Sequence, residues 1–524
     1  MPFVPAGPLM ATRIASVGLI DSRSGLGAAI AALPRWLVLL VAAVAVRAVT
    51  FGNPVVHVDE QFYWVTAERM LHGALPFVDI WDRKPIGLFL LYAPAAALGA
   101  PWGILAYQVM ALAAVVATAM MIGRIADRVG WRAGALPAAL LYVFMLNVAD
   151  GQGGQAPVFY NLLTASALTL VLPRPDDRSE DRARIGRAVA AMLLIGLALQ
   201  IKYSVLFEGL FLGLWLLFRE VRLGAGAIHV LRRGVAYAGM AALPTLAAAA
   251  FYASLGHFNE WFYANFGSIL DRRSDPLLDL VGAFFEVMVP LAPLLAISWL
   301  GWRDLARARA VAAPAMLLFG WLVSAMVGLI VFGSWFPHYA LPVMLPGCLC
   351  CAAWFSQDRR APRIAAPLLL AVMLVAGVGL VLAAQAKRGN REQLETITDA
   401  IGRGPGCLYV HSGDSMLYGY TGRCALSPWL FPSHLSRERE NGAIGVDQFA
   451  EVDRIFARRP AIVVMRSPFR GERLAVRERT MRHLQRLGYA VRGHYLLGQT
   501  PITLYAAPGV AIGDPPRRVA NSRA

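Results

Sequence analysis

The feature that most constrains this chain is a series of apolar runs, each about 15–23 residues long, separated by short charged loops. A helix of about 20 apolar residues crosses a bilayer with its backbone hydrogen bonds satisfied internally. Hydrophobic residues fill 57% of the 524 positions and charged residues only 16%, whereas about a quarter of a soluble chain is charged. The sequence therefore predicts a polytopic α-helical membrane protein. The runs give about eleven transmembrane helices, at residues 35–51, 103–123, 134–150, 157–173, 188–201, 203–218, 235–255, 278–299, 311–332, 339–356 and 364–386.

The basic residues predict which loops face the cytoplasm. With the N-terminus inside, the inside segments hold 21 Lys and Arg residues, whereas the outside loops before the tail hold six. This is the asymmetry of the positive-inside rule. Residues 86–100 are apolar but contain Pro94 and Gly99, and counting them as a span would place every later basic loop outside. We therefore expect them to form a juxtamembrane or re-entrant helix on the outer side.

The C-terminal part of the chain has a different character. It contains no long apolar run, and short strand-like pieces at 407–411, 461–465, 490–497 and 501–507 alternate with helix-like pieces such as 447–458 and 472–487. This alternation predicts a small α/β domain. The expected organisation is a cytoplasmic segment 1–34 with a retained signal anchor, a transmembrane domain 35–386 with an outer loop 52–86, an outer α/β domain 387–508 and a disordered tail 509–524.

Several function classes are disfavoured. The net charge of +16 is compatible with nucleic-acid binding, but the basic residues lie in the loops between apolar runs. The chain has no P-loop, no Cys-x-x-Cys pair and no dinucleotide fingerprint, and its five cysteines lack a metal-site spacing. Cys407 and Cys424 both lie in the outer tail, where a disulfide can form. Cys348, Cys350 and Cys351 fall in a span and are expected to be small packing residues.

The first outer loop, residues 57–85, is the most informative segment. It contains five acids, which are Asp59, Glu60, Glu68, Asp79 and Asp82, and three bases, which are Arg69, Arg83 and Lys84. Residues 59–73 have amphipathic helical spacing and predict a helix that lies on the bilayer surface. From these residues alone, an ordinary solvated loop with an interfacial helix is an equally good interpretation.

The order of residues in this loop resembles one family. The matching residues are Asp59-Glu60 before Tyr63, His72-Gly73, Pro76-Phe77, Asp79, Trp81-Asp82 and Lys84-Pro85, followed later by Gly196-Leu197 to Lys202 and by His338-Tyr339 with Pro342 and Pro346. They resemble the GT-C superfamily of polyprenyl-phosphate-sugar-dependent glycosyltransferases. The nearest branch contains the protein O-mannosyltransferases, the lipid A aminoarabinose transferase and the rhizobial lipopolysaccharide core transferases. The resemblance covers about residues 35–386.

The resemblance implies a reaction. A sugar moves, with inversion, from a polyprenyl phosphate to an acceptor hydroxyl at the outer face of the cell inner membrane. Asp59 would be the general base and Glu60 the next candidate, since a positioned carboxylate can take the hydroxyl proton as the new bond forms. The acceptor would be a lipopolysaccharide, another glycolipid, a polysaccharide or a protein. No cofactor is firmly implied beyond the lipid-linked donor.

The lysines point to the donor phosphate without help from the family. The chain has 46 arginines but only three lysines, Lys84, Lys202 and Lys387, all at predicted outer membrane boundaries. Lysine is a compact charge that binds phosphate well. Lys84 and Lys202 are therefore expected to bind the leaving phosphate, although chance placement of three residues stays an alternative. Lys387 is expected to be a membrane-edge anchor.

Other polar residues near the outer face are candidates for substrate binding. Carboxylates within spans usually line a cavity, which marks Glu208 and Glu286, although a snorkelling or helix-packing role is an alternative. His338 is expected to contact the phosphate or acceptor, although plain interfacial packing fits this short loop equally well. The remaining candidates are Tyr63, Asp79, Asp82, Asp150, Gln155 and Tyr339. Many relatives carry a second acid where this chain reads DGQGGQAPVFYN, so we assign no metal ligand and leave metal dependence undecided.

Two other functions are compatible with the sequence. A transporter or lipid flippase of cell-envelope precursors would favour paired broken helices and charges near the bilayer midplane. The intramembrane acids lie instead toward the outer edge, and no internal repeat is visible. A scaffold whose tail binds a partner would not require Asp59. Neither alternative accounts for the acidic first loop that ends in lysine.

Overall fold

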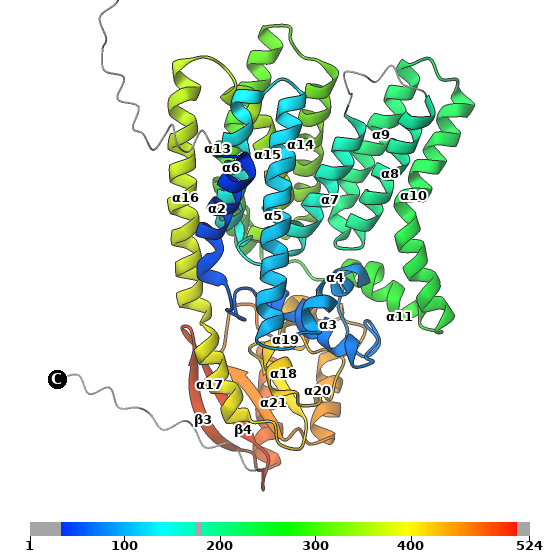
Figure 1. Cartoon of the computed structure of the whole chain (residues 1–524). Coiled ribbons are helices and arrows are strands. Elements are labelled where there is room, and N and C mark those ends of the chain that lie inside the picture. The colour runs from blue at the N-terminus through cyan, green and yellow to red at the C-terminus, as the bar shows by residue number, and fades with distance from the viewer. Residues whose placement is uncertain (1–32, 173–180, 511–524) are drawn as a thin grey trace, which may run out of the picture.

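The computed structural model describes residues 33–172 and 181–510, so most of the predicted segment 1–34 and of the tail 509–524 lies outside the described residues. A long helical bundle stands above a smaller α/β unit (Figure 1). Each of the eleven predicted spans coincides with a helix of the bundle. These helices are α2 (Arg35–Arg47), α5 (Trp102–Arg128), α6 (Arg132–Leu146), α7 (Ala156–Val171), α8 (Asp181–Leu199), α9 (Leu206–Arg222), α10 (Ala227–Ser254), α13 (Leu277–Arg307), α14 (Ala313–Phe332), α15 (Leu341–Phe355) and α16 (Arg360–Arg388).

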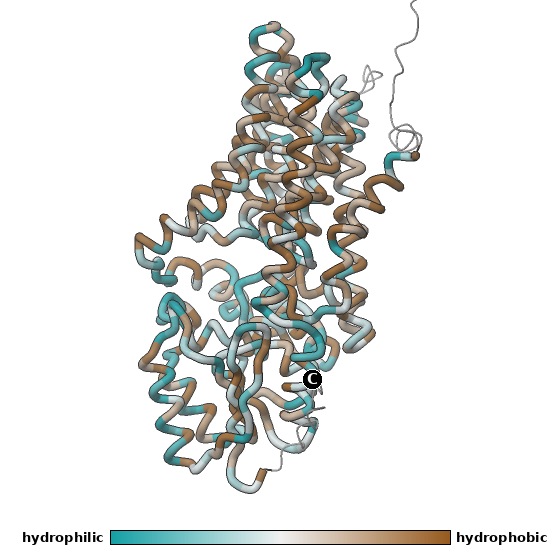
Figure 2. Tube along the Cα trace, turned by 90° about the vertical axis from the view of Figure 1, so that its left-hand side faces the viewer, coloured by the Kyte–Doolittle hydropathy of each residue, from teal (hydrophilic) through white to brown (hydrophobic). Residues whose placement is uncertain are grey.

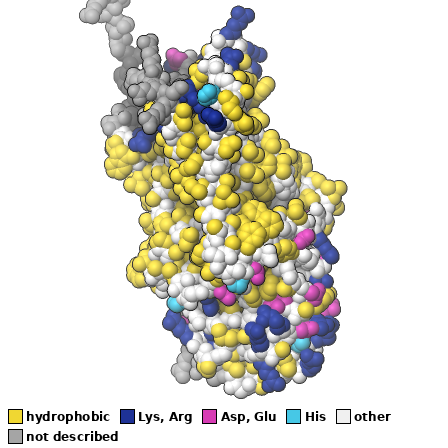
Figure 3. All heavy atoms as spheres, turned by 90° about the vertical axis from the view of Figure 1, so that its right-hand side faces the viewer, with side chains coloured by type: hydrophobic (Ala, Val, Ile, Leu, Met, Phe, Trp, Pro, Cys, Tyr) yellow, Lys and Arg dark blue, Asp and Glu magenta, His cyan; other side chains and the backbone are white. Residues whose placement is uncertain are grey.

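The composition of the bundle matches a bilayer. Among the described residues, seven helices are long and apolar enough to cross a membrane, and α2, α7 and α9 are shorter. Hydrophobic residues dominate the bundle, whereas the lower unit mixes hydrophilic and hydrophobic residues (Figure 2). On the face in Figure 3, hydrophobic side chains form a broad middle band, and Lys and Arg gather at the upper end and over the lower unit. The chain is a multi-pass membrane protein.

Two short helices of the first outer loop lie between the bundle and the lower unit (Figure 1). Helix α4 (Ile86–Ala96) has 11 residues and is about 17 Å long, which is too short to cross a core of about 30 Å. Helix α3 (Val58–Leu71) was predicted to lie on the bilayer surface, and that prediction is wrong: its residues from Glu60 to Ala67 are all buried. The lower unit covers it, since the ring of Phe62 lies 5.2 Å from that of Phe431.

The lower unit begins where α16 leaves the bundle. This helix has 29 residues, about 44 Å, so it extends beyond the hydrocarbon core. Its end at Gly389 has a φ of 106°, and a Cβ there would meet the backbone of Gly498 at 2.7 Å, so a larger residue would not fit. Helix α17 (Arg391–Ile401) follows, with Asn390 and Gln393 forming a capping box.

A four-stranded sheet forms the centre of the lower unit. Its strand order is β1-β2-β4-β3, with β1 and β2 parallel and the other pairs antiparallel. All four predicted strands are present, as β1 (Leu408–Ser412), β2 (Ile462–Arg466), β3 (Ala490–Leu497) and β4 (Thr500–Ala506), together with the predicted helices α20 (Gln448–Ala457) and α21 (Leu474–Arg486). The sequence analysis missed the shorter α18 (Met416–Thr421) and α19 (Pro432–Ser436). Cys407 and Cys424 form a disulfide beside β1. The free Cys348, Cys350 and Cys351 are buried in α15, as expected of packing residues.

Candidate active site

Asp59 lies in the first turn of α3, where the bundle meets the lower unit. The residue before the helix, His57, caps it, because the backbone N–H of Asp59 donates to His57 Nδ1 at 3.2 Å. The carboxylate of Asp59 then has three basic side chains around it. His57 Nδ1 and His338 Nε2 each lie 3.7 Å from it, and Lys84 Nζ lies 3.8 Å away. The site thus holds a half-buried carboxylate beside one ammonium and two imidazoles.

These neighbouring side chains, Lys84 above all, control the charge of Asp59. Burial raises the pKa of its carboxyl group, but the nearby basic groups, Lys84 first, outweigh burial and hold the pKa well below its ordinary value. Asp59 is therefore ionised at neutral pH and can accept a proton. A further bound cation would lower the pKa of Asp59, whereas an anion that drew the Lys84 ammonium away would raise it.

Lys84 is held in place by a second acid. Its ammonium lies 3.2 Å from Asp82 Oδ2, and Asp82 Oδ1 also accepts from the backbone N–H of Arg83 at 2.7 Å. The rings of Tyr63 and Phe431 lie 5.4 and 5.7 Å from the same ammonium, within cation–π range. Burial lowers the pKa of Lys84, but Asp82 and Asp59 more than offset this, so its pKa is raised and the ammonium stays charged. The predicted candidates Tyr63 and Asp82 thus contact Lys84.

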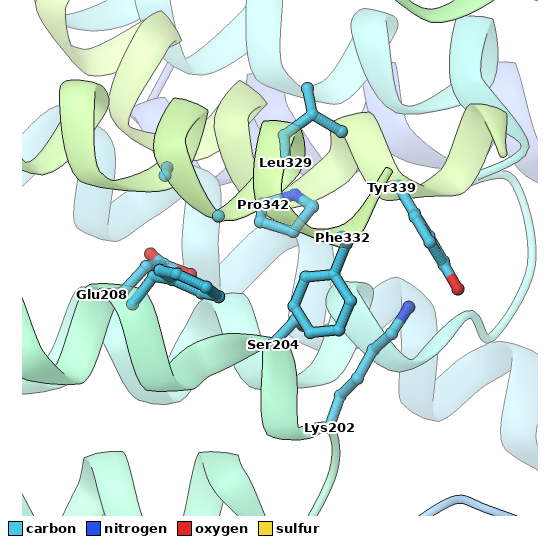
Figure 4. Close-up of a pocket in the computed structure, with 10 residues that line it drawn as sticks. Lys202, Ser204, Glu208, Leu329, Phe332, Tyr339 and Pro342 are labelled. Carbon is cyan, nitrogen blue, oxygen red and sulfur yellow. The ribbon is translucent and has the colours of Figure 1, made fainter. Parts of the chain in front are cut away.

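Lys202 approaches the same region from the turn between α8 and α9. Its ammonium lies 4.3 Å from the centre of the Tyr339 ring, at one end of a small cavity (Figure 4). Burial, opposed by the charge of Asp59 and reinforced by that of Lys84, lowers the pKa of Lys202 to about 8. Lys84 and Lys202 therefore both place positive charge near Asp59, and a bound anion would stabilise the two ammonium groups.

The cavity beside Lys202 is mostly apolar. It runs between α9 and α14, and Glu208 lies at the end away from Lys202 (Figure 4). Glu208 is buried and accepts a hydrogen bond from the indole N–H of Trp321. Glu208 therefore lines the cavity and also joins α9 to α14 through Trp321, so both interpretations of its position describe part of its surroundings. The apolar lining residues are Phe207, Ala325, Gly328, Leu329, Phe332 and Pro342.

The loop that follows α6 also reaches the site. Asp150 has a left-handed backbone with a φ of 57°. Its Oδ2 lies 3.8 Å from His57 Nε2, and its Oδ1 accepts from Arg388 at 2.9 Å. The side-chain amide of Gln155 lies 2.6 Å from His57 Nδ1. Both predicted residues therefore hold His57.

Glu60 does not share the surroundings of Asp59. Adjacent helix positions are about 100° apart around the axis, so the two carboxylates point in different directions. Glu60 is fully buried, and a Cβ on Gly153 would lie 2.1 Å from one of its oxygens, so a side chain at position 153 would displace the Glu60 carboxylate. Arg47 donates to the carbonyl of Gly151 at 2.8 Å and also to that of Gly153. Burial raises the pKa of Glu60 to about 7. Glu60 therefore packs against the loop at Gly153, and its role as a second proton acceptor stays a prediction.

Two predicted residues are not brought to the site. Asp79 is exposed and accepts from the backbone N–H of Leu75 at 2.7 Å, so it stabilises a turn. Glu286 is exposed on α13, although its span position predicted a cavity lining. The helix face on which a residue falls depends on the neighbouring helices, which the sequence does not specify. Lys387 is exposed, as expected for a membrane-edge anchor.

The sequence analysis missed several members of the site. His57 lies two residues before Asp59 and directly before the helix, and this place was a usable signal for a cap. Arg47 is a charged residue at the end of an apolar run, and such residues are often functional. Arg388 and Phe431 gave no signal, because they lie more than 300 positions along the chain from the loop they contact.

One group of side chains could hold a metal ion. The ligating atoms of His57, Asp59 and His338 lie within 4.8 Å of one another. Two imidazoles and a carboxylate are a ligand set that Zn²⁺ accepts. Lys84, however, places a positive charge 3.8 Å from the same carboxylate, which opposes a cation.

Known proteins were compared with the chain. No protein-family model matches the sequence, and no curated protein matches it. The structure is similar to that of ArnT from Cupriavidus metallidurans, with a TM-score of 0.56 and 16% identity over 92% of this chain and 98% of that one. ArnT bound to undecaprenyl phosphate gives the same TM-score and identity over 90% and 98%. The oligosaccharyltransferase of Archaeoglobus fulgidus gives a TM-score of 0.53 and 12% identity over 85% and 70%.

The chain has the GT-C fold. The similarity extends through the bundle and into the lower unit, since it covers 92% of the chain. The predicted polytopic helical fold with a small C-terminal α/β part is thereby confirmed, as is the expectation of a GT-C-like fold. At these identities the GT-C likeness concerns the fold, and function has to be argued from the site itself.

Proposed function

We propose that this protein is a glycosyltransferase that moves a sugar from a polyprenyl phosphate to an acceptor hydroxyl at the outer face of the cell inner membrane. The observation that carries the proposal is the Asp59 carboxylate 3.8 Å from the Lys84 ammonium, with Lys202 at one end of a small, mostly apolar cavity. A lipid phosphate needs these parts: cations for its head and an apolar surface for its chain. The solved complexes of ArnT with undecaprenyl phosphate and of the archaeal enzyme with a dolichol-phosphate support this choice of donor.

The chemistry follows from the positions of the charges. Lys84 and Lys202 bind the phosphate and stabilise the negative charge that grows as the sugar–phosphate bond breaks. Asp59 takes the proton of the acceptor hydroxyl as the new glycosidic bond forms on the opposite face of the sugar carbon, which gives inversion. When the phosphate shares the charge of Lys84, less positive charge acts on Asp59 and its basicity rises. Binding of the donor therefore strengthens the base that the transfer requires.

The finer assignments belong to the same proposal. The acceptor would be a glycolipid, a polysaccharide or a protein, because each offers a hydroxyl group at the membrane surface. The α/β part from residue 387 and the site would face the periplasm. Reporter fusions at residues 128, 227 and 440 test this orientation: a cytoplasmic signal is expected at 128 and 227 and an outside signal at 440. A cytoplasmic signal at 440 would contradict it.

Donor binding can be tested without knowing the sugar. Undecaprenyl phosphate is titrated into the detergent-solubilised full chain, and the shift of the melting temperature gives its affinity. A charge-assisted contact contributes on the order of 1.5–3 kcal/mol, so Lys84→Ala and Lys202→Ala should each weaken binding roughly 10- to 150-fold. Lys387→Ala is the matched control and should bind normally. Equal affinity in all four proteins would reject the donor site.

The same preparation separates a transferase from a flippase. Reconstituted vesicles with a fluorescent polyprenyl phosphate on one leaflet are followed in time. A transferase leaves the probe on its leaflet, whereas a flippase moves it across at a rate that scales with protein content. Protein-dependent movement would favour the transporter alternative.

A further inference from the structure

Glu440, in the lower unit, lies at the meeting point of three loops. Its side chain is 3% exposed. Arg83 of the first outer loop contacts Glu440 Oε2 at 2.6 Å, and Arg272 of the segment before α13 contacts Oε1 at 3.0 Å. Arg439 of the lower unit itself lies 3.6 Å from Oε1. One nearly buried carboxylate thus faces arginines from three separate segments.

Arg83 is held almost completely by these contacts. Besides Glu440, its guanidinium donates to the hydroxyl of Ser268 at 3.0 Å and to the carbonyl of Ala443. The guanidinium carbon Cζ of Arg83 also lies 4.8 Å from the centre of the Trp81 ring. A guanidinium fixed in so many directions restricts the backbone on either side of it. The next residue along the chain is Lys84.

The lower unit makes further contacts in the same area. Arg439 donates to Asp275 at 3.1 Å, and Arg273 contacts Glu438 at 3.1 Å, so the segment before α13 is tied down as well. The ring of His434 lies 4.7 Å from that of Trp81. With Phe431 beside the Lys84 ammonium, the lower unit covers the loop from Trp81 to Lys84 from one side.

We propose that the α/β part completes the active site, and that Glu440 is a positioning residue that fixes Lys84 through Arg83. The proposal rests on the proposed function for the meaning of Lys84. A displacement of about 1 Å at a catalytic group can cost about 100-fold in rate, and Arg83 is adjacent to the ammonium-bearing residue. Removing the charge of Glu440 leaves three guanidiniums close together without their shared partner, so the loop moves.

The test compares Glu440→Gln with Glu395→Gln in the full chain. Glu395 is a matched control, because it forms an exposed ion pair with Arg391 in the same part of the chain. Hydrogen exchange of the amides of residues 79–86 is measured in both proteins. In Glu440→Gln these amides should exchange about tenfold faster or more, and in the control they should be unchanged. Unchanged exchange in a folded Glu440→Gln would overturn the proposal.

Two additions keep the result clear. Arg83→Lys retains the charge but loses the fork of donors, and it should speed the same amides if Glu440→Gln does not fold. Undecaprenyl phosphate affinity is then measured for Glu440→Gln in the wild-type and Lys84→Ala backgrounds. Weakening of roughly tenfold is expected in the first background and none in the second, since both changes act on one contact. Equal weakening in both backgrounds would overturn the route through Lys84. Normal affinity in the Lys84→Ala protein would reject the proposed function. The hydrogen-exchange measurement would still show whether Glu440 holds the loop in place.

Discussion

The ammonium of Lys84 lies 3.8 Å from the carboxylate of Asp59. In this arrangement the proposed base and the proposed phosphate ligand restrain each other until a donor arrives. The lysine keeps the carboxylate ionised and lowers its basicity, and the carboxylate helps keep the lysine charged. Under the proposed function, a bound donor phosphate would share the charge of Lys84 and thereby raise the basicity of Asp59.

Asp82 should matter for donor binding although it is not expected to touch the donor. It is buried, and it accepts from the Lys84 ammonium at 3.2 Å. Asp82→Asn keeps the shape but weakens a charge-assisted contact, so we expect undecaprenyl phosphate affinity to fall roughly tenfold. The matched control is Asp79→Asn in the same loop, where the carboxylate stabilises an exposed turn. Tighter binding in Asp82→Asn would show that Asp82 competes with the phosphate instead of orienting the lysine.

Donor binding should weaken at alkaline pH because of Lys202. Burial lowers the pKa of this ammonium to about 8, and only the protonated form attracts a phosphate. Affinity for undecaprenyl phosphate should therefore be complete below about pH 7 and decline as the pH rises through 8. Lys202→Arg stays charged over this range, so its affinity should be lower at neutral pH but independent of pH up to about 9. A decline of the same size in Lys202→Arg would assign the titration to another group.

Glu60 should tolerate loss of its charge but not of its shape. Its oxygens pack against Gly153, and burial already raises its pKa to about 7, so the neutral form is close in energy to the ionised form. Glu60→Gln should retain transfer activity, whereas Glu60→Ala, which leaves a void, should lower activity and the melting temperature. Gly153→Ala should have the same effect as Glu60→Ala by steric conflict. Loss of activity in a stable Glu60→Gln protein would return Glu60 to the list of proton acceptors.

The sequence predicted the bundle well, because span length and loop charge are local properties. The α/β part was predicted for the same reason, through short strands such as β1 and β4. A shared role for Lys84 and Lys202 could be predicted because lysine is rare in this sequence. The roles of Glu440 and Phe431 could not be found, because they depend on contacts between segments more than 300 positions apart. Glu286 was misplaced and α3 was assigned to the bilayer surface for a related reason: packing partners decide which faces are buried.

The central claim, that Asp59 accepts the proton of the acceptor, is tested most directly by Asp59→Asn. The variant is expressed in a strain that lacks the native chain, and lipid-linked and transferred sugars are measured by mass spectrometry over time. Transfer should fall about 10²- to 10⁴-fold, while undecaprenyl phosphate affinity of the purified variant stays equal or rises, since Lys84 loses its competing partner. Near-normal transfer by a well-expressed Asp59→Asn protein would contradict the account.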